Sequence, residues 1–219
     1  MTIQLFIAGF ILVYILDSGS LIFTLAMLAF MEISAVFNIV KPRLDKIPKR
    51  ISGLIAMAML FGSLVTLSLF MIFVIKPEPI YNPQYLIPLA CMIMGNSMNG
   101  ISLALDSLIR SINDDTSQIE GALMLGSSPA MAMKEANKEA FDIALTPTLN
   151  SMKNMGLITL PGMMTGQILG GNSPMLAIKY QIAIMTVITS ANTISIFLFL
   201  KFAYKHFFNK ESQLEKLGE

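Results

Sequence analysis

The stretch ISGLIAMAMLFGSLVTLSLFMIFVI, residues Ile51–Ile75, decides the fold class of this chain. It contains no Asp, Glu, Lys or Arg, and as a helix it is long enough to cross the roughly 30 Å hydrocarbon core of a bilayer. Other apolar blocks flank it at Ile3–Leu16, Leu21–Val40, Leu86–Ile109, Ile143–Leu169 and Ala177–Leu200. We therefore predict an all-α, polytopic membrane protein with about six transmembrane helices, forming a single transmembrane domain over residues 1–219.

The composition agrees with this fold class. Of the 219 residues, 54% are hydrophobic and 13% are charged, whereas a soluble domain carries about 25% charged residues. The net charge of +1 gives no reason to expect nucleic-acid binding. The single cysteine, Cys91, excludes an internal disulfide, and the single histidine, His206, lies beyond the last apolar block.

Several enzyme classes are excluded by their motifs. The chain contains no HExxH, no GxSxG and no GxxxxGK[ST] sequence, so we predict no catalytic residues and no cofactor. If the protein uses ATP, another chain must bind it. The 18 methionines are scattered and form no repeated MxxM frame, so we interpret them as flexible apolar filler rather than soft-metal ligands.

The charge pattern of the loops predicts the topology. The loop Lys41–Arg50 carries five basic residues and one acid, which places it in the cytoplasm, and the Pro-rich loop Lys76–Tyr85 suits the outer face. Alternation then places residues 110–142 and the tail 201–219 in the cytoplasm, and the tail supports this with Lys201, Lys205 and Lys210. We expect a multi-pass protein of the cell membrane with both ends cytoplasmic.

The first apolar block is shorter than a full span. Ile3–Leu16 measures about 21 Å at ~1.5 Å per residue, and it lacks the basic start and the cleavage site of a signal peptide. We expect the chain to begin inside a helix whose first part is absent.

The fourth block leads into a predicted helical hairpin at residues 110–142. Its helical pattern continues from Leu86 to Leu125, and Gly126 ends it as a C′ glycine would. Ser128 as N-cap and Pro129 at the first helical position then begin a second arm. The hairpin is either a solvated connection or a surface that docks onto another protein, and its amphipathic pattern favours docking.

The fifth block contains two features that are unusual in a membrane helix. Gly162, Gly166 and Gly170 recur every four residues and form a face that lets helices pack closely, either within the chain or between two copies. Pro161-Gly162 is expected to interrupt the helix. Broken membrane helices lie where protein buries them or where they line a cavity.

Polar residues at membrane depth define a candidate substrate pathway. Just before the break, Asn150, Lys153 and Asn154 share one helix face, and Lys153 either snorkels to the cytoplasmic surface or lines the pathway. In the fourth block, the spacing of Asn96, Asn99 and Asp106 brings them close to one face. Interhelical hydrogen bonds are the alternative role of such residues. Four further polar residues are candidates to join this face: Glu32, Asn38, Asn192 and Thr193.

Three sequence segments carry a specific resemblance to a known protein family. They are MIMGNSMNGISLALDSL (Met92–Leu108), EGALMLGSSPAMA (Glu120–Ala132) and LTPTLNSMKNMGLITLPGMMTGQILGGNSPMLAIKYQI (Leu145–Ile182). The chain resembles the FetB-type iron export permease family of ABC transporters, which has plant relatives linked to aluminium tolerance. The likeness runs from about Thr2 to the last apolar block, whereas family members usually carry one more N-terminal helix, seven in all.

The resemblance implies a function and partners. Glu120-Gly121-Ala122 followed by Gly126 is similar to the EAA-xxx-G pattern of ABC permeases, with glycine at the middle position, so that Glu120, Gly126, Ser128 and Pro129 would couple to an ATPase. It implies two permease copies with two ATPases exporting iron or another metal ion. The oxygens of Asn96, Asn99, Asn150 and Asp106 are then candidate metal contacts, with Lys153 as a charge gate; the residues themselves define no metal site. The alternatives are an ATP-independent carrier or channel and a non-transporting membrane scaffold.

Overall fold

The computed structural model describes residues 2–44, 47–48, 50–209 and 213–214, and these are almost entirely helical. This confirms the all-α fold class. The α-helices are α1 (Thr2–Ser18), α2 (Leu21–Val40), α3 (Ile51–Phe70), α4 (Pro83–Asp114), α5 (Thr116–Met124), α6 (Pro129–Ala132), α7 (Lys134–Asn154), α8 (Gly162–Leu169) and α9 (Pro174–Ala203). A π-helical turn, Met71–Ile75, extends α3, and short 3₁₀ turns follow α2 (Lys41–Arg43) and α9 (Tyr204–His206).

Four helical segments of the described chain are long and apolar enough to cross a membrane: Leu21–Arg43, Ile51–Ile75, Pro83–Asp114 and Pro174–His206. They correspond to four of the predicted apolar blocks. The first block forms the shorter helix α1, of 17 residues. The fifth block forms two helices, α7 and α8, so that its crossing is interrupted rather than continuous.

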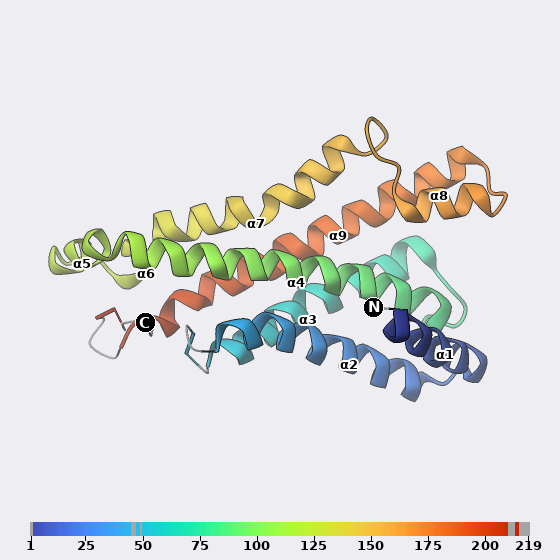
Figure 1. Cartoon of the computed structure of the whole chain (residues 1–219), viewed down its shortest axis with the longest axis horizontal. Helices are drawn as coiled ribbons and strands as arrows, with labels where there is room; N and C mark the ends of the chain where they lie inside the picture. The colour runs from blue at the N-terminus through green and yellow to red at the C-terminus, as the bar shows by residue number, and fades with distance from the viewer. Residues whose placement is uncertain (1, 45–46, 49, 210–212, 215–219) are drawn as a thin grey trace.

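The long helices pack side by side, with α4 in the middle of the bundle (Figure 1). α7 runs antiparallel to α4 on one side, α2 and α3 lie on the other, and α9 crosses the bundle in contact with α3, α4 and α7. The side chains between them are apolar and fully buried, among them Ile55, Ile101, Leu105, Leu108 and Phe199. In a bilayer this close packing, rather than exclusion of water, holds the helices together.

The turn at Gly126 has the predicted helix-ending geometry. The N–H of Ser127 donates to the Ala122 carbonyl (3.0 Å) and that of Gly126 to the Leu123 carbonyl (3.0 Å), while Gly126 has a φ of +89°. This is a Schellman motif, in which glycine avoids the strain of a left-handed backbone. α6 begins directly after Ser128 with Pro129 at its first position, as expected, although the Ser128 side chain makes no capping bond.

The arms of the hairpin are less regular than predicted. The first arm is not one unbroken helix, because α4 ends at Asp114 and Asp115 adopts non-helical angles (φ −107°, ψ 18°) before α5. Local polar side chains compete with the helix there, since the Thr116 hydroxyl donates to the Ile112 carbonyl (2.6 Å). The second arm breaks at Met133, and α7 then runs without interruption from Lys134 through Pro147 to Asn154.

The predicted interruption of the fifth block begins at Met155, before Pro161-Gly162. The Asn154 carbonyl accepts bonds from the N–H groups of Ile158 (3.0 Å) and Thr159 (3.3 Å), and Gly156 has a φ of +80°. The chain therefore turns tightly at the end of α7 and resumes a helix only after Pro161.

Close helix contacts fall on glycines other than the predicted ones. A Cβ at Gly62 would overlap the Ser195 hydroxyl, and a Cβ at Gly100 would overlap Oδ1 of Asn192 on α9. In contrast, no heavy atom lies within 4 Å of a Cβ built on Gly162 or Gly166, apart from the local backbone. Within the described chain this glycine face is uncovered, which leaves packing between copies as its remaining interpretation.

Replacing Gly100 by Ala is expected to destabilise the bundle by about 1–3 kcal/mol, because the added methyl group forces Asn192 to move. The matched control is Gly95→Ala on the same helix, where a Cβ meets nothing within 4 Å and the better helix propensity of Ala is expected to keep or raise stability. Thermal unfolding of the purified protein in detergent measures both. Equal unfolding temperatures for the two variants would contradict the close contact between α4 and α9.

Candidate substrate pathway and coupling surface

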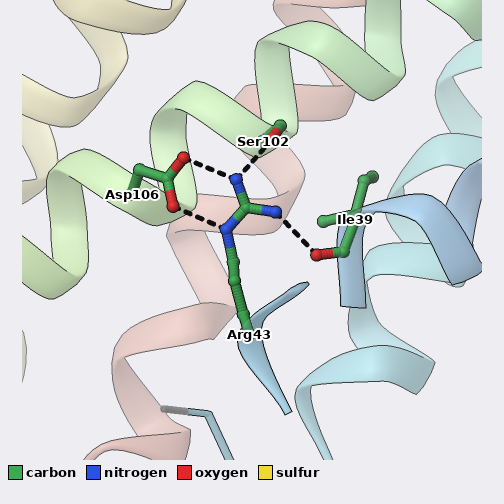
Figure 2. Close-up of polar contacts among 4 residues, drawn as sticks. All are labelled: Ile39, Arg43, Ser102 and Asp106. Carbon is green, nitrogen blue, oxygen red and sulfur yellow. Dashed lines mark hydrogen bonds and ion pairs between the residues drawn. The ribbon is translucent and has the colours of Figure 1, made fainter. Parts of the chain in front are cut away.

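An ion pair joins α4 to the segment that follows α2 (Figure 2). Arg43 Nε donates to Asp106 Oδ1 and Nη2 to Asp106 Oδ2, both at 2.5 Å. The same guanidinium donates to the Ile39 carbonyl (2.7 Å) and to the Ser102 hydroxyl (2.7 Å). Such a two-pronged, charge-assisted contact fixes orientation as well as charge.

This pair changes the interpretation of Asp106. Arg43 lies at the end of the α2 span that the loop charges assign to the cytoplasm, so Asp106 lies at that level and not at the centre of the bilayer. The side chain of Arg43 is 13% exposed and that of Asp106 is 49% exposed. In this conformation Arg43 engages the carboxylate, and Asp106 is not open to a cation. Its role as a metal contact stays a prediction.

The two asparagines of α4 differ in their surroundings. Asn96 is half-buried and its Nδ2 donates to the Met92 carbonyl of its own helix (2.8 Å), whereas Asn99 is exposed. In the part of the chain that the structure describes, no hydrogen bond or ion pair joins any two of the six pathway candidates, which are Asn96, Asn99, Asp106, Asn150, Lys153 and Asn154. The candidates therefore form no preassembled binding site in this chain alone.

A buried polar contact connects α7 to α9 beside Gly100. Nδ2 of Asn192 donates to the Thr148 hydroxyl (2.9 Å), and the two residues are 1% and 8% exposed. Asn192 thus takes the interhelical hydrogen-bonding role that is the alternative to a pathway role. The hydroxyls of Ser97 and Ser195 are also buried, without hydrogen-bond partners among the described residues.

The last turn of α7 carries Asn150, Lys153 and Asn154, all of them exposed. The Thr189 hydroxyl of α9 donates to Met152 Sδ (3.1 Å), so this turn lies level with Thr189. At ~1.5 Å per residue, Thr189 is about 18 Å along α9 from Lys201, in its last turn. Lys153 therefore lies well away from the cytoplasmic end of α9, and its pathway role stays a prediction.

The end of the bundle beyond Asp114 presents apolar side chains to the outside. Met124 is 86% exposed, Leu125 is 90% exposed and Met131 is 68% exposed. They surround the turn formed by Gly126, Ser128 and Pro129, and Glu120 is exposed on the preceding helix α5. Large apolar side chains exposed together at a helical bend are typical of a protein-docking surface.

The sequence pattern did not predict a partner for Arg43, which appears there only as part of a basic loop. The signal was the unexplained carboxylate of Asp106 on an apolar helix, because such a group needs a partner. The spacing in sequence could not identify Arg43, since the pair joins residues that are 63 positions apart.

A double-mutant cycle tests the ion pair. Arg43→Ala is expected to destabilise the protein more than Asp106→Ala, because Arg43 also bonds Ile39 and Ser102, and the two positions are expected to couple by about 1 kcal/mol. The control Asp114→Ala removes an exposed acid of the same helix and is expected to change stability by less than about 0.5 kcal/mol. Additive effects at Arg43 and Asp106 in thermal unfolding would contradict the pair.

Comparison with known proteins identifies the family. The uncharacterised protein family UPF0014 matches residues 1–208. A UPF0014 membrane protein of Synechocystis is 35% identical over 97% of this chain and 82% of its own length. The probable iron export permease protein FetB of Escherichia coli is 34% identical over 97% of this chain and 80% of its own.

Protein ALUMINUM SENSITIVE 3 of Arabidopsis thaliana is likewise 34% identical over 97% of this chain and 76% of its own length. These matches confirm the resemblance to the FetB family and its plant relatives. No solved structure matches the chain. The chain belongs to the UPF0014 family of multi-pass membrane proteins.

Proposed function

We propose that this protein is the membrane-spanning permease subunit of an ABC transporter that exports iron or another metal ion, driven by a separate ATPase subunit. One observation carries the proposal: α4 and α7, which hold the polar candidates, are also the two arms of the hairpin that ends in the exposed apolar bend at Gly126. The likeness to a protein named as a probable iron export permease extends over 97% of the chain and supports it.

The hairpin suits the transmission of movement from an ATPase. Met124 and Leu125 supply an apolar contact, with Glu120, Ser128 and Pro129 around it, and Gly126 fixes the shape of the turn. Buried Met133 and a long bond from the Ser111 hydroxyl to Glu139 Oε2 (3.4 Å) tie α6 and α7 to the bundle. A push on the bend would therefore move α4 and α7 together, because packed interiors transmit strain.

The metal ion would pass the break at the end of α7. Asn150 and Asn154 offer amide oxygens there, and oxygen ligands suit iron. Within the described ranges there is no group of three or more Asp, Glu, His or Cys that could hold a metal ion tightly. Weak contacts are what passage requires, since a transported ion must also leave. Lys153, at the same level, would act as the charge gate.

A second permease copy would complete the pathway. The uncovered face of Gly162, Gly166 and Gly170 on and after α8 is suited to close packing against another helix. Pairing two copies through this face would also enclose the break that lies next to it in sequence.

Leu125→Gln is expected to reduce binding of the ATPase, because it replaces a side chain that is 90% exposed at the bend by a polar one. Co-purification of an ABC ATPase with the affinity-tagged chain measures this. The control Leu44→Gln makes the same change at a leucine that is 59% exposed, near the same end of the bundle but outside the bend. Equal retention by both variants, or no ATPase with the unaltered chain, would contradict the assignment.

Lys153→Ala is expected to impair metal export, so that cells carrying it accumulate iron toward the level of cells without the gene. The control is Lys179→Ala, which removes an exposed lysine near the N-terminal end of α9. Cells carrying this control are expected to export metal normally. Cellular metal content measures both. Normal content in cells carrying Lys153→Ala with Asn154→Ala would favour a non-transporting scaffold. Ion flux from the purified chain in liposomes without an ATPase would favour an independent carrier.

A further inference from the structure

A cavity of about 440 Å³ lies between α2 and α3, on the opposite side of α4 from α7. Glu32 of α2 lines this cavity and is only 8% exposed. Neither of its carboxylate oxygens has a hydrogen-bond partner among the described residues. An acid buried at membrane depth without any partner is costly, and such residues mark binding or transport sites by default.

The described residues supply no counter-charge at this cavity. Among them, Glu32 is the only charged residue in its lining. Arg43, which follows the same helix, is engaged by Asp106 and lies about 16 Å further along at ~1.5 Å per residue. The Ser63 hydroxyl faces the same cavity but donates its hydrogen to the Met59 carbonyl (2.7 Å). A counter-charge for the ionised carboxylate would therefore come from outside the described part of the chain, and a bound cation would supply it.

The lining decides what kind of cation fits. A metal ion such as magnesium or calcium takes six or more oxygen ligands, whereas this cavity offers one carboxylate and the hydroxyls of Ser63, Ser68 and Tyr81. The other lining side chains are apolar, including Leu28, Leu60, Leu67, Met71 and Met94. A mostly apolar cavity of this size with a single fixed charge has the character of a site for an organic ligand.

We propose that this cavity binds a hydrophobic organic monocation, whose charged centre pairs with Glu32 and whose apolar groups lie against α2 and α3. The site is separate from the break at the end of α7. The inference does not depend on metal export, so either can fail without the other.

Binding of tetraphenylphosphonium to the purified full chain, measured by isothermal titration calorimetry in detergent, tests the proposal. Glu32→Gln is expected to weaken binding by at least about tenfold, because it removes the buried charge while keeping the shape. The control Glu135→Gln makes the same change at an exposed position in the first turn of α7 and is expected to leave the Kd unchanged. An unchanged Kd for Glu32→Gln would overturn the proposal.

A second variant separates binding from folding. Ala29→Phe adds a ring to the cavity lining and leaves Glu32 in place, so it is also expected to weaken binding. Thermal unfolding of Glu32→Gln is expected to show equal or higher stability, since a buried unpaired carboxylate is removed. Tetraphenylborate matches the probe in size with the opposite charge. It is titrated alone, because the two ions precipitate together, and it is expected not to bind.

Three results would overturn the assignment. Binding of tetraphenylborate alone that is as tight as binding of tetraphenylphosphonium would mean that apolar burial alone determines binding. Normal binding by Ala29→Phe would place the probe elsewhere. Binding of Fe²⁺ or Mn²⁺ alone that Glu32→Gln abolishes, without an effect on the organic cation, would make Glu32 a metal ligand.

Discussion

Inside a bilayer no water is available to bond a polar group, so the chain must satisfy its own backbone and side-chain groups or present them to a partner or a cavity. The long helices meet this constraint for their backbones. Buried side chains meet it in pairs, as Asn192 does with Thr148, while Arg43 pairs with Asp106 at the cytoplasmic level. Some positions fail to meet it, and two of these, the end of α7 and Glu32, are the ones to which we assign function.

This constraint also explains how the bundle is divided. α4 lies between the interrupted crossing of α7 and α8 on one side and the helices α2 and α3, which line the cavity, on the other (Figure 1). α9 packs closely against α3 at Gly62 and against α4 at Gly100. A cation bound beside Glu32 and a metal ion at the break would thus occupy separate environments in the same chain.

Local features of the fold could be predicted from the sequence, because neighbouring residues determine them. Apolar blocks of membrane-spanning length identified the helices, and the order Gly126, Ser128, Pro129 identified the bend. Features that depend on distant residues could not. Nothing local distinguishes Gly100, which packs against Asn192, from Gly166, which packs against nothing in the described chain. Likewise, only the folded chain brings Arg43 to Asp106.

The break between α7 and α8 has an electrostatic consequence. Peptide dipoles align along a helix, leaving a partial negative charge at the C-terminal end of α7 and a partial positive charge at the N-terminal end of α8. Both ends meet the gap at residues 155–161. A cation that passes there is attracted by backbone carbonyls on one side and repelled by backbone amides on the other. That field belongs to the main chain. The difference between the two sides of the break would therefore persist in part whatever side chains surround it.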